Sequence, residues 1–178
     1  ALAVGRDVAD GRRLVAVADT AHASVDNSLR LLGLEALVVP TGDDGRFVGG
    51  ALADALAASG RAGQLAIVVA SAGSTNGGAA LLLDERSRLF DGLADADSLI
   101  IDPHKWLFST AGSCAVLYRQ PQLAAATHTQ HGPYIDVLHT TDAAATWNPS
   151  DYAFQLTRRA SGLPFWFTLV LHGTDALA

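Results

Sequence analysis

Residues 98–106 read Ser-Leu-Ile-Ile-Asp-Pro-His-Lys-Trp, an apolar run followed by a proline turn that carries two basic side chains. The run 98–101 predicts a strand. Pro103 ends that strand, because proline has no backbone N–H to donate to a sheet. His104 and Lys105 therefore follow the end of a strand. Ligands of open α/β sheets bind at the carboxyl ends of the strands, so this turn is a candidate site.

Short apolar runs alternate with helical patterns on both sides of this turn. Further strands are predicted over residues 14–18, 36–40, 65–70 and 114–118. Helices are predicted over residues 24–32, 51–58, 84–90, 123–127, 151–160 and 164–172. The run 65–70 is apolar throughout, which is typical of a strand buried on both faces of a parallel sheet. The alternation indicates an α/β domain whose sheet is largely parallel or mixed and is flanked by helices.

The composition excludes several classes of function. Apolar residues make up 49% of the 178 residues and charged residues 17%, which excludes an intrinsically disordered chain. No apolar run reaches the ~20 residues of a membrane-spanning helix, so no membrane partner is expected. The net charge of -6 argues against a nucleic-acid partner, because phosphate binding needs a basic face. No signal peptide is visible, and a single cysteine, Cys114, cannot form an internal disulfide; both features favour a cytoplasmic location.

Lysine occurs once in the sequence, at position 105, whereas arginine occurs eleven times. Arginine stays protonated, but lysine can lose its proton when it is desolvated and can then condense with a carbonyl group. The count alone leaves two interpretations open. Either the composition has drifted toward arginine, or a reactive amine has been kept at one place.

The strand followed by Asp102-Pro103-His104-Lys105-Trp106 resembles the lysine motif of the group II pyridoxal-phosphate decarboxylases. That family includes aromatic-L-amino-acid, glutamate and diaminobutyrate decarboxylases. The resemblance implies the large domain of a fold-type I enzyme that uses pyridoxal 5'-phosphate, with mostly parallel strands between helices. It implies that Lys105 condenses with the cofactor, and that His104 contacts the cofactor phosphate or positions Lys105. It implies no metal.

Two segments before this motif follow the order of the same family. Ala21-His22-Ala23-Ser24 resembles the segment whose histidine stacks on the cofactor ring, which implies that His22 does so and orients the substrate carboxylate. Residues 71–76 resemble a cofactor-binding turn, which implies that Thr75 hydrogen-bonds cofactor or substrate. Each segment also has a structural interpretation. His22 could cap the helix that starts near Ser24, and turns of serine, glycine and threonine are common in α/β proteins.

Tyr134 lies 29 residues after Lys105. The family has a loop tyrosine at this separation, which implies that Tyr134 delivers a proton to the substrate Cα after carbon dioxide leaves. The alternative is an exposed tyrosine without a catalytic role.

The resemblance extends over nearly the whole chain and implies that residues 1–178 are a fragment of the central cofactor-binding large domain. The family's N-terminal segment and its small C-terminal domain are expected to be absent. Residues 76–80 run from the threonine turn directly into an apolar pattern, where the family has a helix and a strand with an aspartate that pairs with the pyridine nitrogen. A crossover between parallel strands needs a dozen or more residues, so we expect roughly 25 residues or more to be missing near 76–78. Neither Asp84 nor Asp102 stands in the context of that aspartate.

The implied function is the decarboxylation of an L-amino acid to its amine and carbon dioxide, by a homodimer whose active site lies at the subunit interface. Beyond Arg119, Arg158 and Arg159, the loops hold few basic residues that could bind a second carboxylate. This favours an aromatic or other neutral substrate. Two alternatives stay open: another fold-type I enzyme, such as an aminotransferase or a desulfurase, or a non-catalytic remnant of the fold.

A cluster of histidines supports a competing hypothesis. His128 and His131, with Asp136 and His139 nearby, could bind zinc, although the predicted loop does not fix their geometry. The serine-rich turns do not indicate a hydrolase, because the sequence contains no G-x-S-x-G elbow.

Overall fold

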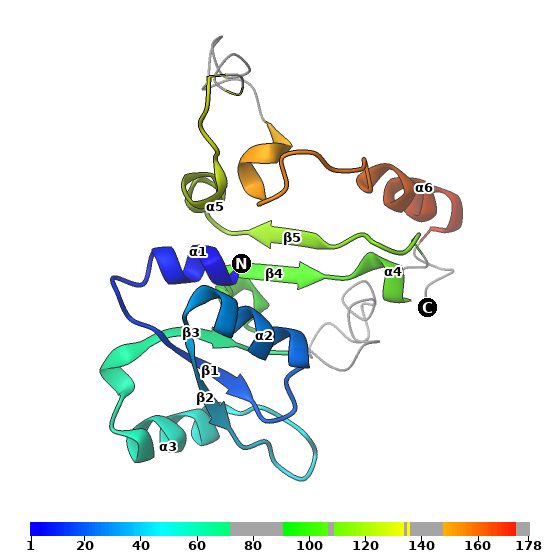
Figure 1. The fold of residues 1–178 in the computed structure, drawn as a ribbon. Helices are drawn as coiled ribbons and strands as arrows, with labels where there is room; N and C mark the ends of the chain where they lie inside the picture. Colours follow the sequence, from blue (N-terminus) through cyan, green and yellow to red (C-terminus); the bar gives the residue numbers. More distant parts are fainter. Residues whose placement is uncertain (72–90, 107–108, 134, 136–147, 174–178) are drawn as a thin grey trace. The chain divides into compact units, whose positions relative to one another are not determined.

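The computed structural model describes residues 1–71, 91–106, 109–133, 135 and 148–173. The chain divides into two compact units, which are treated separately here (Figure 1). The N-terminal unit is Leu2–Ser74, and the C-terminal unit comprises Ala1 and Thr75–Ala178.

The N-terminal unit contains a parallel sheet with the strand order β2-β1-β3. Its elements are α1 (Leu2–Asp7), β1 (Leu14–Ala18), α2 (Ala23–Leu32), β2 (Glu35–Val39), α3 (Gly49–Ser59), η1 (Ala62–Gln64) and β3 (Leu65–Val69). The three strands and two of the helices are predicted from the sequence to within about two residues, and these predictions are confirmed. Helix α1 is not predicted, because six residues are too few to establish a helical period.

The core of this unit is built on β1, in which all five residues are buried. Val15 and Val17 of β1 pack against Leu29 of α2 and against Leu34. The prediction that 65–70 is the strand buried on both faces is wrong, since β3 is only partly buried and Val68 is 45% exposed. The reason is position: β1 has a partner strand on each side, whereas β3 pairs with β1 alone among the described strands.

The C-terminal unit contains a two-stranded antiparallel sheet. Its elements are η4 (Leu93–Asp95), β4 (Ser98–Ile101), α4 (Pro103–Trp106), β5 (Ala115–Tyr118), α5 (Pro121–His128), η6 (Pro149–Tyr152) and α6 (Gly162–His172). Strand β4 pairs with β5 from Ser98 opposite Tyr118 to Ile101 opposite Ala115. The two predicted strands are confirmed. Parallel strands need a long crossover between them, whereas the described part of the segment between β4 and β5 contains only the short helix α4, which fits antiparallel pairing.

The helix predicted over residues 151–160 is wrong. The chain makes the short helix η6 and continues in extended backbone at Ala153. Phe154 contacts His128 of α5 edge-to-face, with the ring centroids 4.6 Å apart, and the Gln130 side chain donates to the Phe154 carbonyl. Phe154 therefore packs against α5 instead of continuing η6 into a longer helix. The predicted helix 84–90 lies outside the described residues.

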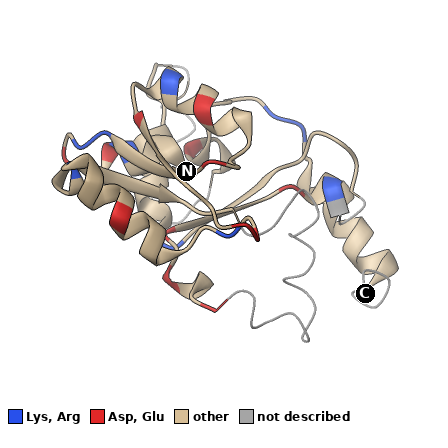
Figure 2. Cartoon of the chain, turned by 90° about the horizontal axis from the view of Figure 1, so that it is seen from below, with Lys and Arg blue, Asp and Glu red and all other residues tan. Residues whose placement is uncertain are grey.

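Basic residues are scattered along the described chain, as Figure 2 shows. No described helix or strand contains more than one lysine or arginine. Among the described residues, no helix is both long enough and apolar enough to span a bilayer. The alternating strands and helices confirm the predicted α/β class.

Candidate functional site

Lys105 lies on α4, immediately beyond the carboxyl end of β4, as the sequence predicts. The Lys105 Nζ atom is 2.8 Å from Oδ2 of Asp102, and the two side chains are 39% and 30% exposed. The backbone N–H of Lys105 also donates to the carbonyl of Asp102. Pro103 between them is fully buried. The amine is therefore held on one anchored turn but stays accessible to solvent.

The ion pair sets the electrostatics of this turn. The hydrogen bond from Lys105 is the largest cause that holds the pKa of Asp102 below its ordinary value, and burial opposes it. Cys114, just before β5, has a raised pKa, first because the thiol is partly buried and then because Asp102 is near. The thiol is thus kept protonated beside a carboxylate that is kept ionised.

His104 ties the same turn to the segment that enters β5. Its Nδ1 lies 2.7 Å from the carbonyl oxygen of Ser113, a buried residue. A carbonyl only accepts, so Nδ1 carries the proton and donates. This bond fixes the ring and the turn, which supports a positioning role for His104. Contact with a cofactor phosphate stays a prediction.

His22 lies at the carboxyl end of β1 in the N-terminal unit, at the start of α2. Its Nδ1 accepts a hydrogen bond of 3.2 Å from the backbone N–H of Ser24 and lies 2.8 Å from the Ser24 hydroxyl. The capping interpretation is therefore correct. Capping occupies Nδ1 and leaves the ring faces of this exposed side chain available. Stacking on a cofactor ring stays a prediction.

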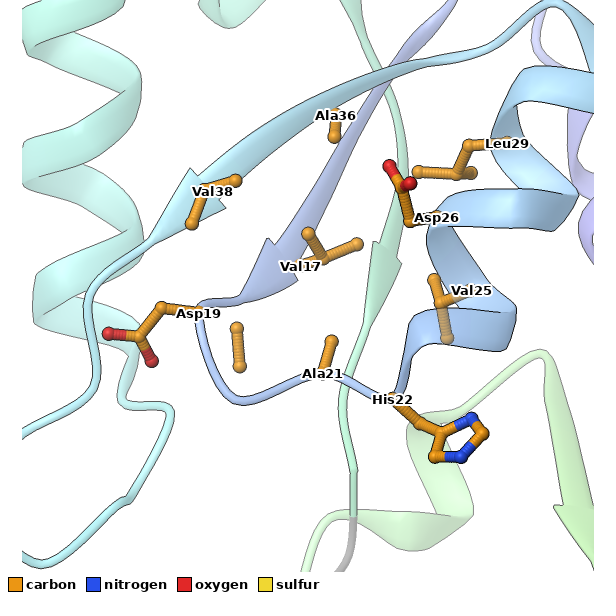
Figure 3. Close-up of a pocket in the computed structure, with 10 residues that line it drawn as sticks. Val17, Asp19, Ala21, His22, Val25, Asp26, Leu29, Ala36 and Val38 are labelled. Carbon is orange, nitrogen blue, oxygen red and sulfur yellow. The ribbon is translucent and has the colours of Figure 1, made fainter.

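A hollow of about 220 Å³ borders His22 between the sheet and α2 (Figure 3). Its walls include Val25 and Asp26 of α2 and Asp19, the residue that follows β1. The hydroxyl of Thr41 donates to Asp19 at 2.7 Å, and hydrogen bonds from Thr41 hold the pKa of this exposed carboxyl below its ordinary value. The pair joins the carboxyl ends of β1 and β2, and so steadies the loop that carries His22.

The structure brings only part of the predicted site together. Lys105, His104 and Asp102 lie on one turn of the C-terminal unit, and His22 belongs to the N-terminal unit. Thr75 and Tyr134 lie outside the described residues. Sequence reasoning missed the pairing of Asp102 with Lys105, although their i, i+3 spacing was a usable signal.

The histidines of the zinc hypothesis are only partly described. His128 is buried in the C-terminal unit with its ring against Phe154. Asp136 and His139 lie outside the described residues. In the described part of the chain, no three histidine, cysteine or acidic side chains form a group that could hold a metal ion.

Comparison with known proteins identifies relatives of this chain. Residues 76–178 match the family model of the pyridoxal-dependent decarboxylase conserved domain. An aromatic-L-amino-acid decarboxylase of Bacillus atrophaeus is 27% identical over 194 residues, which cover 92% of this chain and 40% of that protein. A phenylacetaldehyde synthase of Petunia hybrida is 30% identical over 101 residues, covering 56% of this chain and 20% of that protein.

Solved structures share the fold. The crystal structure of Oryza sativa TDC with PLP and tryptamine has a TM-score of 0.86 at 24% identity, and covers 99% of this chain and 45% of that one. The crystal structure of mouse CSAD has a TM-score of 0.80 at 21% identity, with coverage of 99% and 45%. These likenesses confirm a partial fold-type I large domain. The chain spans less than half the length of each of these relatives.

Proposed function

Because the chain belongs to the pyridoxal-dependent decarboxylase family, we propose that the whole protein removes the carboxyl group of an aromatic L-amino acid as carbon dioxide, with pyridoxal 5'-phosphate as cofactor. The observation that carries this proposal is the position of Lys105. The single lysine of the chain lies on the turn after β4, within the matched residues, with its amine accessible. An aromatic substrate is supported by relatives that are named aromatic-L-amino-acid, tyrosine and tryptophan decarboxylases.

The side chains of the site fit this cofactor. A primary amine can condense with the cofactor aldehyde, and the imidazole of His104, anchored through Nδ1 to the Ser113 carbonyl, holds the turn that carries this amine. When bound, pyridoxal phosphate supplies an aromatic ring that accepts the electron pair left behind as carbon dioxide departs. We assign Lys105 to hold the cofactor and His104 to keep the turn of Lys105 in place.

The remaining predicted residues act on the substrate. The exposed imidazole of His22 has ring faces for an aromatic group, and its Nε2–H is left to orient the substrate carboxylate while Nδ1 caps α2. Thr75 would donate a hydrogen bond from its hydroxyl. Tyr134 would deliver the proton to Cα from its phenol. All three roles come from the resemblance of their segments to the family.

A gap in the chain bears on activity. The alignment with the Bacillus protein extends over 194 positions, more than the 178 residues of this chain, so that relative contains residues with no counterpart here. The family match also begins at residue 76, where the sequence predicts a missing segment. We infer that residues 1–178 form an incomplete cofactor-binding domain that lacks the aspartate strand. We further propose a homodimer with the site at its interface, in the cytoplasm.

The cofactor site is tested by trapping. The 178-residue chain is mixed with pyridoxal phosphate, reduced with borohydride and mapped by mass spectrometry. We expect the cofactor mass on the peptide that contains Lys105, and Lys105→Arg is the matched control that keeps the charge. Absence of that mass from a folded chain would contradict the proposed cofactor site.

Activity is tested on the whole protein, by measuring carbon dioxide and amine from L-tyrosine and L-tryptophan without a keto acid. Release from the wild type that falls by at least about 10³-fold in Lys105→Arg supports a decarboxylase. A product that forms only with a keto acid would indicate an aminotransferase. A chain that traps the cofactor at Lys105 but releases no carbon dioxide would indicate a non-catalytic remnant.

A further inference from the structure

Asp102 has no role in the function proposed above, yet it makes the shortest polar contact of the reactive lysine that the structure shows. We propose that Asp102 is a positioning residue: its ion pair with Lys105 holds the amine on the α4 turn and slows its condensation with an aldehyde. The inference deepens the proposed function, on which it rests for the identity of the aldehyde as pyridoxal phosphate.

The ion pair is held by the backbone around it. Asp102 Oδ2 and Lys105 Nζ are 2.8 Å apart, at i, i+3 spacing, and the Lys105 N–H donates to the Asp102 carbonyl at 3.1 Å. Between them, Pro103 is buried, and its ring fixes the backbone angle φ. His104 anchors the turn to Ser113. The two charged groups are therefore positioned by a fixed turn.

Lys105 is the main cationic partner of Asp102 among the groups that lie near this carboxylate. The nearby thiol of Cys114 also helps to lower the pKa of Asp102, and His104 adds a weaker electrostatic contribution. Among the described residues, Lys105 makes the one ion pair of this carboxylate. Removing the carboxylate therefore acts mainly on Lys105.

The chemistry explains how the pair affects reactivity. The Lys105 ammonium must first release a proton to solvent. The neutral amine then adds to the aldehyde carbon, a C=N bond forms, and the carbonyl oxygen leaves as water. The ion pair holds the amine of Lys105 against Asp102, and this contact must break before the amine can reach the aldehyde carbon. Because both groups are partly exposed, we expect an effect of about two- to fivefold on the rate.

The experiment measures the amine itself, separately from cofactor binding. The 178-residue chain is treated with formaldehyde and cyanoborohydride at pH 8, and methylation of the Lys105 peptide is followed by mass spectrometry. The hydride of cyanoborohydride reduces the C=N bond, so each condensation is recorded. We expect Asp102→Asn to react about two- to fivefold faster than the wild type. Asp95→Asn, at an exposed carboxylate of η4, is the matched control and is expected to leave the rate unchanged.

Two further readouts separate an ion pair from a structural role. Asp102→Glu restores a carboxylate and is expected to return the rate close to that of the wild type. Sodium chloride at about 1 M screens the pair and is expected to accelerate the wild type toward the rate of Asp102→Asn, with little effect on that variant. Circular dichroism checks that each variant is folded.

Equal rates for the wild type and Asp102→Asn would overturn the proposal. So would a fast Asp102→Asn whose advantage persists at high salt, since that result indicates a loosened turn. Repeating the comparison with pyridoxal phosphate separates the two proposals. If neither protein traps pyridoxal phosphate while the formaldehyde rates differ, the cofactor site fails and the role of Asp102 stands.

Discussion

The two units differ in how deeply the strands of their sheets are buried. In the N-terminal unit, the central strand β1 is buried along its whole length within a parallel sheet. In the C-terminal unit, the antiparallel pair β4–β5 keeps apolar side chains in solvent, including Ile100 and Leu117. The second unit nevertheless carries Lys105, and nearly all of it matches the decarboxylase family. The most deeply buried strand and the reactive lysine thus lie in different units of the chain.

The comparison also shows how each unit positions a polar side chain. His22 follows a fully buried strand and caps a helix, so the core of its unit places it. Lys105 depends on a short turn fixed by Pro103, Asp102 and the bond from His104 to Ser113. Substitutions in the two units should therefore affect different observables.

The largest effect is expected from truncating the buried strand. Leu14→Ala removes a side chain that is 0% exposed, and we expect a loss of about 2–5 kcal/mol in the free energy of unfolding. Leu117→Ala makes the same change at a side chain that is 57% exposed, and we expect a loss below about 1 kcal/mol. Denaturant titration measures both. Similar losses would show that the two sheets do not differ in the way that their burial indicates.

A smaller effect is expected at the end of α2. Gly33 has φ +65° and closes the helix, its N–H donating to the carbonyl of Arg30. Gly33→Ala forces a side chain into the left-handed region and should cost about 1–2 kcal/mol. Gly49→Ala, at the start of α3, meets no such strain and serves as the control. Thermal unfolding distinguishes the two, and equal melting temperatures would contradict the prediction.

The bond from His104 to Ser113 is expected to contribute locally. His104→Ala leaves a carbonyl acceptor without its partner, and we expect a loss of about 1–2 kcal/mol, together with faster amide exchange before β5. His104→Asn retains an N–H donor near the same place and should recover part of the loss. Unchanged exchange in His104→Ala would show that this bond does not fix the turn.

The smallest effect concerns pH. The pKa of Asp102 is lowered from its ordinary value of 3.8 by the hydrogen bond from Lys105. A carboxyl with a lowered pKa in the folded state stabilises the fold above pH 3.8, and this contribution is lost as the pH falls through the lowered value. At pH 7, Asp102→Asn should therefore be less stable than the wild type, by no more than about 1 kcal/mol because the pair is partly exposed. Urea titration at pH 7 and pH 2 measures the difference, which should shrink at the lower pH.

The sequence by itself determined the features that depend on short-range chemistry. Apolar runs specified β1, β3 and β4, Gly33 specified the end of α2, and Pro103 with Lys105 specified a turn with a reactive amine. These features follow from backbone sterics and local hydrophobic patterning, which involve neighbouring residues only. The motif around Lys105 likewise identified the family, because its residues are contiguous.

Only the tertiary structure decided which strand is central and how β4 and β5 pair. It decided that Phe154 contacts His128 and does not belong to the helix that the sequence predicts. It also decided that Asp102 pairs with Lys105 and that His104 binds the carbonyl of Ser113. Burial and long-range hydrogen bonds depend on neighbours that are distant in sequence. The sequence pattern of an apolar run such as 65–70 is therefore the same for a central strand and for an edge strand of a sheet.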